Sequence, residues 1–197
     1  MNKSGNENRS VRNTKKKLQD ALLKLLQEKN IGEITVKELT DAVDINRGTF
    51  YFHYSDVYDL LSEIEDRFFA KFYLMVNSIP LTPGENDRLD AFFTFIGENA
   101  DFCKIMLGPR GDIAFTRRVR QLILEKCSDI WDEQSASIDG EVKNLFNAFI
   151  IHGCIGIVQE WLNDDCKASP MEISDLTATI VLSSIKQYTK RTRGGKK

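Results

Sequence analysis

The stretch from Thr35 to Leu60, TVKELTDAVDINRGTFYFHYSDVYDL, constrains the fold of this chain more than any other. Thr35 can cap a helix, because its hydroxyl can accept a hydrogen bond from an amide of the first turn. Apolar residues then recur at helical spacing: Val36, Leu39 and Val43. Asp44 breaks that spacing, Ile45 can fill the turn from inside, and Asn46 can cap again. The pattern predicts two short helices joined by a tight turn, followed by the start of another helix.

The second short helix carries a dense run of cationic, hydroxyl and aromatic side chains, Asn46-Arg47-Gly48-Thr49-Phe50-Tyr51-Phe52-His53-Tyr54. A helix that enters a DNA major groove needs such groups for phosphates, and one or two side chains that reach base edges. We therefore predict a helix-turn-helix whose second helix binds DNA. The alternative is an amphipathic helix pair without a nucleic-acid role.

Each side chain of this helix has an expected part. Arg47 can donate two hydrogen bonds to guanine, Gly48 permits close approach of the backbone, and Phe52 can pack on a thymine methyl group. Phe50 and Tyr54 fall on the inward side and should anchor the helix. The full set predicted to contact DNA is Thr35, Asn46, Arg47, Gly48, Thr49, Tyr51, Phe52 and His53, with Lys15 and Lys16 at the start of the first helix. For the two lysines, a merely solvated helix start is the alternative.

Helical spacing continues along the chain, and no strand pattern or internal repeat interrupts it. We expect an all-α protein of about nine helices, with the helix-turn-helix domain in residues 1–60 and a ligand-binding and dimerisation domain in residues 61–197. A helix from Ser55 or Asp56 to about Asn77 should connect them, about 33 Å long at 1.5 Å per residue. We expect residues 1–10 to be disordered or an arm, and residues 190–197 to be a flexible basic tail.

Composition and charge fit a DNA-binding protein that uses one end of the chain. Of 197 residues, 42% are hydrophobic and 28% charged, which is ordinary for a globular protein. Residues 1–54 have three more positive than negative side chains, whereas the rest has an acidic excess of five. The polar N-terminus lacks a secretory h-region, and no apolar run approaches the ~20 residues of a membrane span. We expect a cytoplasmic protein without a membrane partner.

A catalytic constellation is not apparent in the sequence. The two histidines, His53 and His152, are far apart, and four cysteines are widely spaced without a C-x-x-C pair. We found no glycine-rich phosphate loop, nucleophile elbow or metal-ligand spacing. The sequence therefore predicts no enzyme activity, no metal and no cofactor; a small helical enzyme is a competing hypothesis.

Aromatic residues crowd the second half of the chain. The first interpretation is plain core, with His152 a core or interface histidine; the second is a cavity for a small apolar or aromatic effector. The candidate pocket residues are Phe92, Phe95, Phe102, Phe115, Trp131, Phe149 and His152. The last two helices, residues 141–163 and from Pro170 on, are too apolar to be left exposed, which favours a homodimer. The candidate interface residues are Phe149, Gly153, Ile157, Trp161, Leu176 and Ile180; packing of the Gly153 region inside the monomer is the alternative.

The run from Asn46 to Tyr54, with Leu39 and Ile45 before it, resembles the helix-turn-helix signature of the TetR (tetracycline-repressor) regulators. The resemblance covers about residues 10–60, and the body is similar to a C-terminal type frequent in Firmicutes regulators. It implies that three helices bind DNA and six form a ligand-binding, dimerising body whose last two helices pair across the dimer. The resemblance implies phosphate contacts by Thr35, Thr49, Tyr51 and His53. It implies base contacts by Arg47 and Gly48.

Three positions depart from the family pattern. Asp44 stands where the turn usually has glycine, although Asp tolerates left-handed geometry. Val57 replaces a frequent lysine, which removes an expected phosphate contact, and Tyr54 replaces a usual Phe. We predict a ligand-responsive homodimeric repressor of a palindromic operator. The alternative is a co-activator or adaptor of the same fold that acts mainly through a protein partner.

Overall fold

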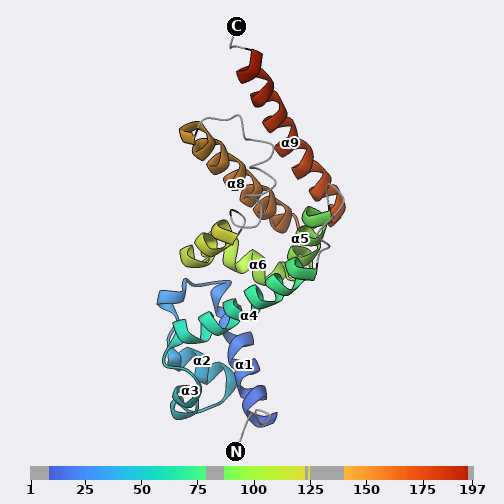
Figure 1. Ribbon diagram of the computed structural model, residues 1–197. Coiled ribbons are helices and arrows are strands. Elements are labelled where there is room, and N and C mark those ends of the chain that lie inside the picture. The colour runs from blue at the N-terminus through green and yellow to red at the C-terminus, as the bar shows by residue number, and fades with distance from the viewer. Residues whose placement is uncertain (1–8, 79–86, 123, 125–139, 195–197) are drawn as a thin grey trace, which may run out of the picture. The chain divides into compact units, whose positions relative to one another are not determined.

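The structure is a computed structural model that describes residues 9–78, 87–122, 124 and 140–194. Within these ranges the chain is all-α, as predicted, and Figure 1 labels the helices. Helices lie at α1 (Arg9–Leu26), α2 (Val36–Val43), α3 (Arg47–His53), α4 (Val57–Ser78), α5 (Asp87–Glu98), α6 (Ala100–Leu107), α8 (Gly140–Asn163) and α9 (Pro170–Gly194), with a 3₁₀ turn at Ile31–Glu33. Residues 113–122 are also helical. The described residues thus contain nine α-helical segments, in agreement with the expected number of about nine.

The chain divides into two compact units. The unit that we call the head comprises residues 1–72 with 109–112, and the unit that we call the body comprises residues 73–108 with 113–197. Helix α4 contributes residues to both units, because the division falls after Phe72. The predicted domain boundary at residue 60 lies inside α4, near its start. The head extends further, to Phe72, and so includes most of α4.

The helix-turn-helix forms through local hydrogen bonds that the sequence predicts. Thr35 Oγ1 accepts from the Glu38 amide (3.2 Å), and the Glu38 carboxylate accepts in return from the Thr35 amide (2.9 Å), which completes a capping box. Asp44 ends α2 in the left-handed conformation (φ 55°, ψ 55°), so aspartate takes the turn position without glycine. Asn46 Oδ1 then accepts from the Thr49 amide (2.8 Å) and begins α3.

Two terminal segments are helical over part of their predicted length. Helix α1 begins at Arg9, so the last two residues of the segment expected to be disordered or an arm are helical. Helix α9 runs to Gly194, so the residues from 190 to 194 are helical instead of a flexible tail. The C-terminal segment is rich in Lys and Arg, which favour helix and are stabilised near a helix C-terminus by its dipole. Residues 1–8 and 195–197 lie outside the described part.

The head has its own hydrophobic core. Five side chains from four helices have no exposed surface: Leu18, Leu22, Leu39, Phe50 and Leu60. Helix α2 packs on both α1 and α3. Phe50 is the contribution of α3, and its burial fixes which side of that helix faces inward. Helix α3 is therefore oriented by its one fully buried ring and by its N-terminal cap.

The body contains two packed clusters. In one, Trp161 of α8 packs edge-on against Phe93 of α5 (ring centroids 5.8 Å apart) and donates from Nε1 to the Ala168 carbonyl (2.8 Å). Gly97 makes room for this indole, because a Cβ there would lie 3.2 Å from it. In the other, Ile150, Ile151 and Ile155 of α8 meet Ile185 of α9. Figure 1 shows α8 beside α9 and α5 beside the start of α9, as their contacts require.

Acid should weaken the head through Glu38. Its carboxylate pairs with Lys29, and this hydrogen bond, with those from Thr35, lowers the pKa of Glu38 to about 2. Because this folded-state pKa lies below the ordinary value of 4.5, the stabilisation is present above about pH 4.5 and is lost as pH falls toward 2. We expect Glu38→Gln to destabilise the head at pH 6 and to make no difference near pH 2.

Unfolding monitored by hydrogen exchange of peptides from residues 29–45, at several pH values, measures this effect. Asp41→Asn is the charge-matched control, since it neutralises an exposed carboxylate on the same helix. A pH-independent difference between Glu38→Gln and the wild type would contradict the assignment.

Candidate nucleic-acid interface

Helix α3 presents one buried side and one exposed side. Phe50 is fully buried, whereas Arg47, Gly48, Tyr51 and Phe52 are exposed. Thr49 and His53 lie between these two classes at the flanks of the helix. An exposed cation, hydroxyl groups and an aromatic ring on one short capped helix are the groups that bind phosphates and base edges in a major groove.

Two of the predicted DNA contacts have structural duties in the protein. The Asn46 side chain is occupied as the cap of α3, where it also accepts from the Thr49 hydroxyl (3.2 Å). Both donors of Thr35, its amide and its hydroxyl, bond to Glu38 (2.9 Å each). A phosphate contact by Thr35 would therefore have to displace a carboxylate. Asn46 can act on DNA mainly by fixing the direction in which α3 points.

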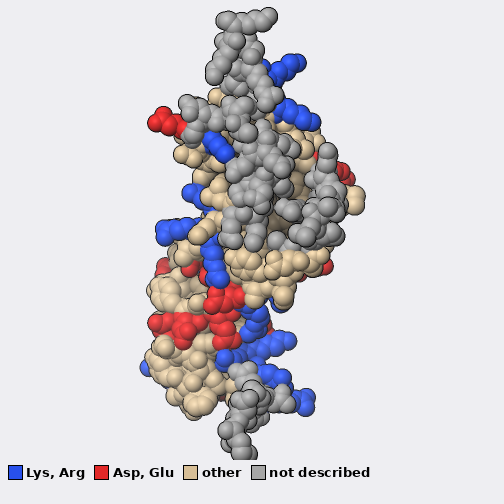
Figure 2. All heavy atoms as spheres, in the orientation of Figure 1, with Lys and Arg blue, Asp and Glu red and all other residues tan. Residues whose placement is uncertain are grey.

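The N-terminal half of α1 supplies positive charge. Arg9, Arg12, Lys16 and Lys17 are exposed along it. Figure 2 shows Lys and Arg gathered over α1, whereas the surface over α2 and α3 is mostly uncharged. Lys15, predicted to reach phosphate, points inward instead: its ammonium pairs with Glu63 (3.0 Å) and lies 5.4 Å from the centre of the Tyr54 ring. Lys16 remains available for a phosphate.

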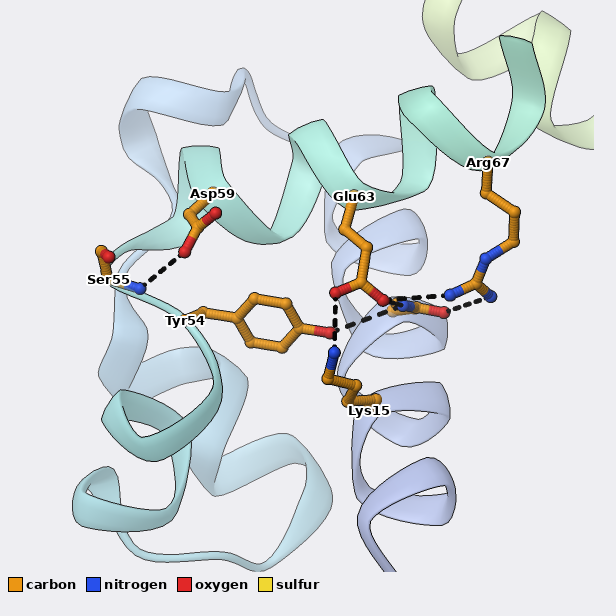
Figure 3. Close-up of polar contacts among 7 residues, drawn as sticks. Lys15, Tyr54, Ser55, Asp59, Glu63 and Arg67 are labelled. Atoms are coloured by element: carbon orange, nitrogen blue, oxygen red, sulfur yellow. Dashed lines mark hydrogen bonds and ion pairs between the residues drawn. The ribbon is translucent and has the colours of Figure 1, made fainter. Parts of the chain in front are cut away.

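A polar network joins the C-terminal end of α3 to α1 and α4 (Figure 3). Gln19 donates to the Tyr54 hydroxyl (3.5 Å) and to Glu63 (3.1 Å), and Arg67 donates to Gln19 (3.1 Å) and to Glu63 (3.0 Å). Burial raises the pKa of Tyr54 to about 12, so the phenol keeps its proton. The network holds three helices of the head together through the residue that ends α3.

The sequence indicated that Tyr54 faces inward, but its polar partners were missed. Gln19 is buried between Leu18 and Leu22, and a polar residue inside an apolar stripe was the available signal. The Tyr54 hydroxyl explains how the Gln19 side chain can be buried, because it accepts a hydrogen bond from the amide. A phenylalanine at position 54 would leave that donor without this acceptor.

The start of α4 is acidic. The Ser55 amide donates to Asp59 (2.8 Å) and the Asp59 amide donates to Asp56 (2.8 Å), while Val57 is buried. These carboxylates occupy amides that a phosphate could otherwise use, and they repel a second anion. The start of α4 therefore lacks the lysine that is frequent at position 57 and also carries two exposed carboxylates, so it is poorly suited to bind phosphate.

Comparisons with known proteins agree with this arrangement. The family model of bacterial regulatory proteins of the tetR family matches residues 18–64, and a model of a transcriptional regulator C-terminal region matches residues 86–183. The chain belongs to the tetR family. The first match covers the second half of α1, all of α2 and α3, and the start of α4. The second match covers α5, α6, α8 and the first half of α9.

Individual relatives of this tetR-family chain are distant. It is 26% identical over 167 residues to the HTH-type transcriptional regulator YxbF of Bacillus subtilis (strain 168). The match spans 80% of this chain but only 42% of that protein. A TetR regulator from Streptococcus agalactiae 2603V has a TM-score of 0.68 at 23% identity, covering 88% of this chain and 96% of that one. The transcriptional regulator FadR from Bacillus subtilis, solved in complex with stearoyl-CoA, has a TM-score of 0.61 at 16% sequence identity. That match covers 85% of this chain and 97% of the FadR chain. These structural likenesses show a shared fold.

The predicted pocket residues of this tetR-family body are only partly brought together. Phe95 and Phe115 are buried, Phe92 and Phe102 are half-buried, and Phe102 packs edge-on against Phe115 (5.5 Å). The assignments of Phe149 and His152 to an interior pocket were wrong, because Phe149 is 66% exposed and His152 is also exposed. The Arg120 guanidinium donates to Nε2 of His152, and Nδ1 donates to the Ala148 carbonyl (2.7 Å). Trp131 lies outside the described residues.

The predicted dimer residues separate into two groups. Phe149 and Gly153 of α8 and Leu176 and Ile180 of α9 are exposed, and Ile157 is half-buried. A Cβ on Gly153 would meet nothing within 4 Å, which disfavours the alternative that this glycine packs inside the monomer. Trp161 was wrongly assigned, because it is buried against Phe93 in the same chain.

Helix α8 also has the length and hydropathy of a membrane span. It is the one helix in the described ranges with this property, and the core helix of a protein without a membrane can pass the same test. Its apolar residues divide between the core of the body and an exposed stripe that includes Leu145 and Phe149. The buried half is explained by packing within the chain, and the exposed half belongs to the candidate dimer face.

Proposed function

We propose that this chain is a DNA-binding transcriptional regulator that acts in the cytoplasm as a ligand-responsive homodimeric repressor, without enzyme activity. The observation that carries the proposal is α3: a capped helix, anchored by buried Phe50, that presents Arg47, Tyr51 and Phe52 to solvent. Membership of the tetR family supports the same function. The exposed cations of α1 supply sequence-independent attraction to phosphate.

The proposed DNA site is a palindrome. A twofold dimer through α8 and α9 would place two copies of α3 about 34–36 Å apart, in successive major grooves of one DNA face. The exposed apolar stripes of α8 and α9 support this dimer, since burying them removes apolar surface from water. With acidic residues at the start of α4, a single head would hold few phosphates, so two heads are needed for tight binding.

The proposed effector is a small apolar or aromatic molecule that binds the body. The aromatic side chains Phe92, Phe95, Phe102 and Phe115 support this chemistry, and FadR, which has a similar fold, was solved with stearoyl-CoA. Such a ligand can regulate DNA binding only if it binds the DNA-competent and incompetent states with different affinities. Helix α4, which contributes residues to both units, is the proposed route between them.

Arg47→Ala tests the DNA-binding proposal. Arginine can donate two hydrogen bonds to guanine, so its loss should cost about 1–3 kcal/mol of affinity and relax the preference at one base pair. The measurement is a fluorescence-anisotropy titration against a duplex selected by the wild type from a random pool, at several salt concentrations. Lys24→Ala, which removes an exposed cation from the last turn of α1, is the control. Equal losses for both variants would argue against the proposal.

The adaptor hypothesis is the alternative that the DNA-binding measurement must exclude. An adaptor that acts through a protein partner needs no phosphate contacts, so the carboxylates of Asp56 and Asp59 at the start of α4 are compatible with it. The two functions differ in how the protein binds duplex DNA. Sequence-selective binding to duplex DNA, with an affinity that decreases steeply as salt rises, supports the DNA-binding function. The absence of measurable binding to any duplex at physiological salt supports the adaptor.

A further inference from the structure

Phe52 is the most exposed of the large apolar side chains in the described part of the chain, at 79%. It follows the fully buried Phe50 by two residues on α3. Since an α-helix turns about 100° per residue, the two side chains point about 200° apart. Phe52 is therefore aimed away from the core of the head, along the line in which α3 would meet another molecule.

The surroundings of Phe52 are suited to close approach. Gly48 lies four residues earlier, on the same side of α3, and has no side chain to hold a partner at a distance. The His53 ring lies edge-on to the Phe52 ring (centroids 5.0 Å apart), which restricts the motion of the phenyl group. The sequence of α3, RGTFYFH, has no acidic residue, and Figure 2 shows a mostly uncharged surface over this helix.

We propose that Phe52 is a specificity-determining residue that reads thymine, by packing its ring against the C5-methyl group in the major groove. The inference rests on the proposed DNA-binding function. Phenylalanine has no hydrogen-bonding group, so it cannot distinguish the donors and acceptors of the base edges. The thymine methyl is the apolar group that these edges offer. Each half-site of the palindrome must then have a thymine at the position that Phe52 reaches.

The size of the effect follows from the area of one methyl group. Burial of one CH₂-sized group contributes about 0.8 kcal/mol, which is about fourfold in affinity. Replacement of the thymine by deoxyuridine removes only this methyl and keeps every hydrogen bond. Replacement in both half-sites should weaken binding by about 15-fold, because the two copies of α3 contribute independently.

The test begins with the full-length wild-type protein and a pool of random duplexes, from which a preferred palindrome is selected. Each thymine of a half-site is then replaced in turn by deoxyuridine, and affinities are measured for the wild type and for Phe52→Ala. We expect one position at which deoxyuridine weakens the wild type about 15-fold and leaves Phe52→Ala unchanged. Phe52→Ala should fold normally, because the ring is outside the core.

Tyr51→Phe is the matched control, since it alters the neighbouring exposed ring on the same helix. It should shift the affinities for thymine and deoxyuridine duplexes in parallel and preserve their ratio. Sequence-specific binding in which no thymine depends on Phe52, or a preferred half-site without thymine, overturns this inference and leaves the proposed function intact. Failure of the wild type to select any sequence overturns both.

Discussion

Phe149→Glu is expected to make the protein monomeric and to lower its affinity for a two-half-site duplex by about 100-fold or more. Phe149 is 66% exposed on α8, one turn from the similarly exposed Leu145. In a twofold interface every substitution occurs twice, so two carboxylates would be buried without partners. A monomer then loses the effective concentration that links the two heads on DNA, which accounts for a factor of about 10²–10⁴.

Ile113→Glu is the matched control for this variant. Ile113 is a large apolar residue of the body that is 77% exposed, and it lies outside α8 and α9. Light scattering measures the molar mass and hence the oligomeric state, and titrations at the same protein concentrations measure the affinity for the two-half-site duplex. Ile113→Glu should remain dimeric and bind normally. A Phe149→Glu protein that stays dimeric would exclude this face as the interface.

The parts of the head that could be predicted from sequence are those determined by neighbours along the chain. Thr35, Asp44 and Asn46 each contact only residues within four positions along the chain. Their side-chain chemistry therefore indicates where α2 begins and ends and where α3 begins. The inward position of Phe50 follows equally from helical spacing. Such local signals are independent of how the rest of the chain packs, and the predicted helix-turn-helix is accordingly the structure observed.

The polar network of the head could not be predicted in this way. It joins Gln19 to Tyr54, 35 positions later, and to Arg67, 48 positions later. Spacing within one helix says nothing about which polar groups meet across three helices. The same limitation caused Lys15 to be assigned to phosphate, since a run of lysines does not indicate that one member is paired with Glu63.

The body shows a second limit of sequence patterns. Helix α8 is apolar around most of its circumference, so periodicity does not separate the side that packs within the chain from the side left exposed. Trp161 was therefore assigned to a dimer face although Phe93 covers it, and Phe149 was assigned both to a pocket and to an interface. The tertiary contacts of α5 and α9 decide between these alternatives, and they involve residues distant in sequence.

Phe50→Ala is expected to destabilise the head by about 3–5 kcal/mol, the usual cost of removing a buried phenylalanine ring. Phe50 has no exposed surface and packs against the rings of Tyr51 (5.6 Å) and Tyr54 (5.8 Å). Because domains are typically stable by only about 5–15 kcal/mol, the variant head should open often enough to lose DNA binding at physiological temperature.

Hydrogen exchange of peptides from residues 36–60 measures the opening of the head directly. Phe52→Ala provides a closely matched control: it is the same substitution, two residues along the same helix, at an exposed ring. Its effect on stability should be below about 0.5 kcal/mol. We expect Phe50→Ala to accelerate exchange throughout α2 and α3, and Phe52→Ala to leave exchange unchanged while altering DNA sequence preference. Similar exchange in both variants would mean that α3 is not anchored through Phe50, and the assignment of its inward and outward sides would then be wrong.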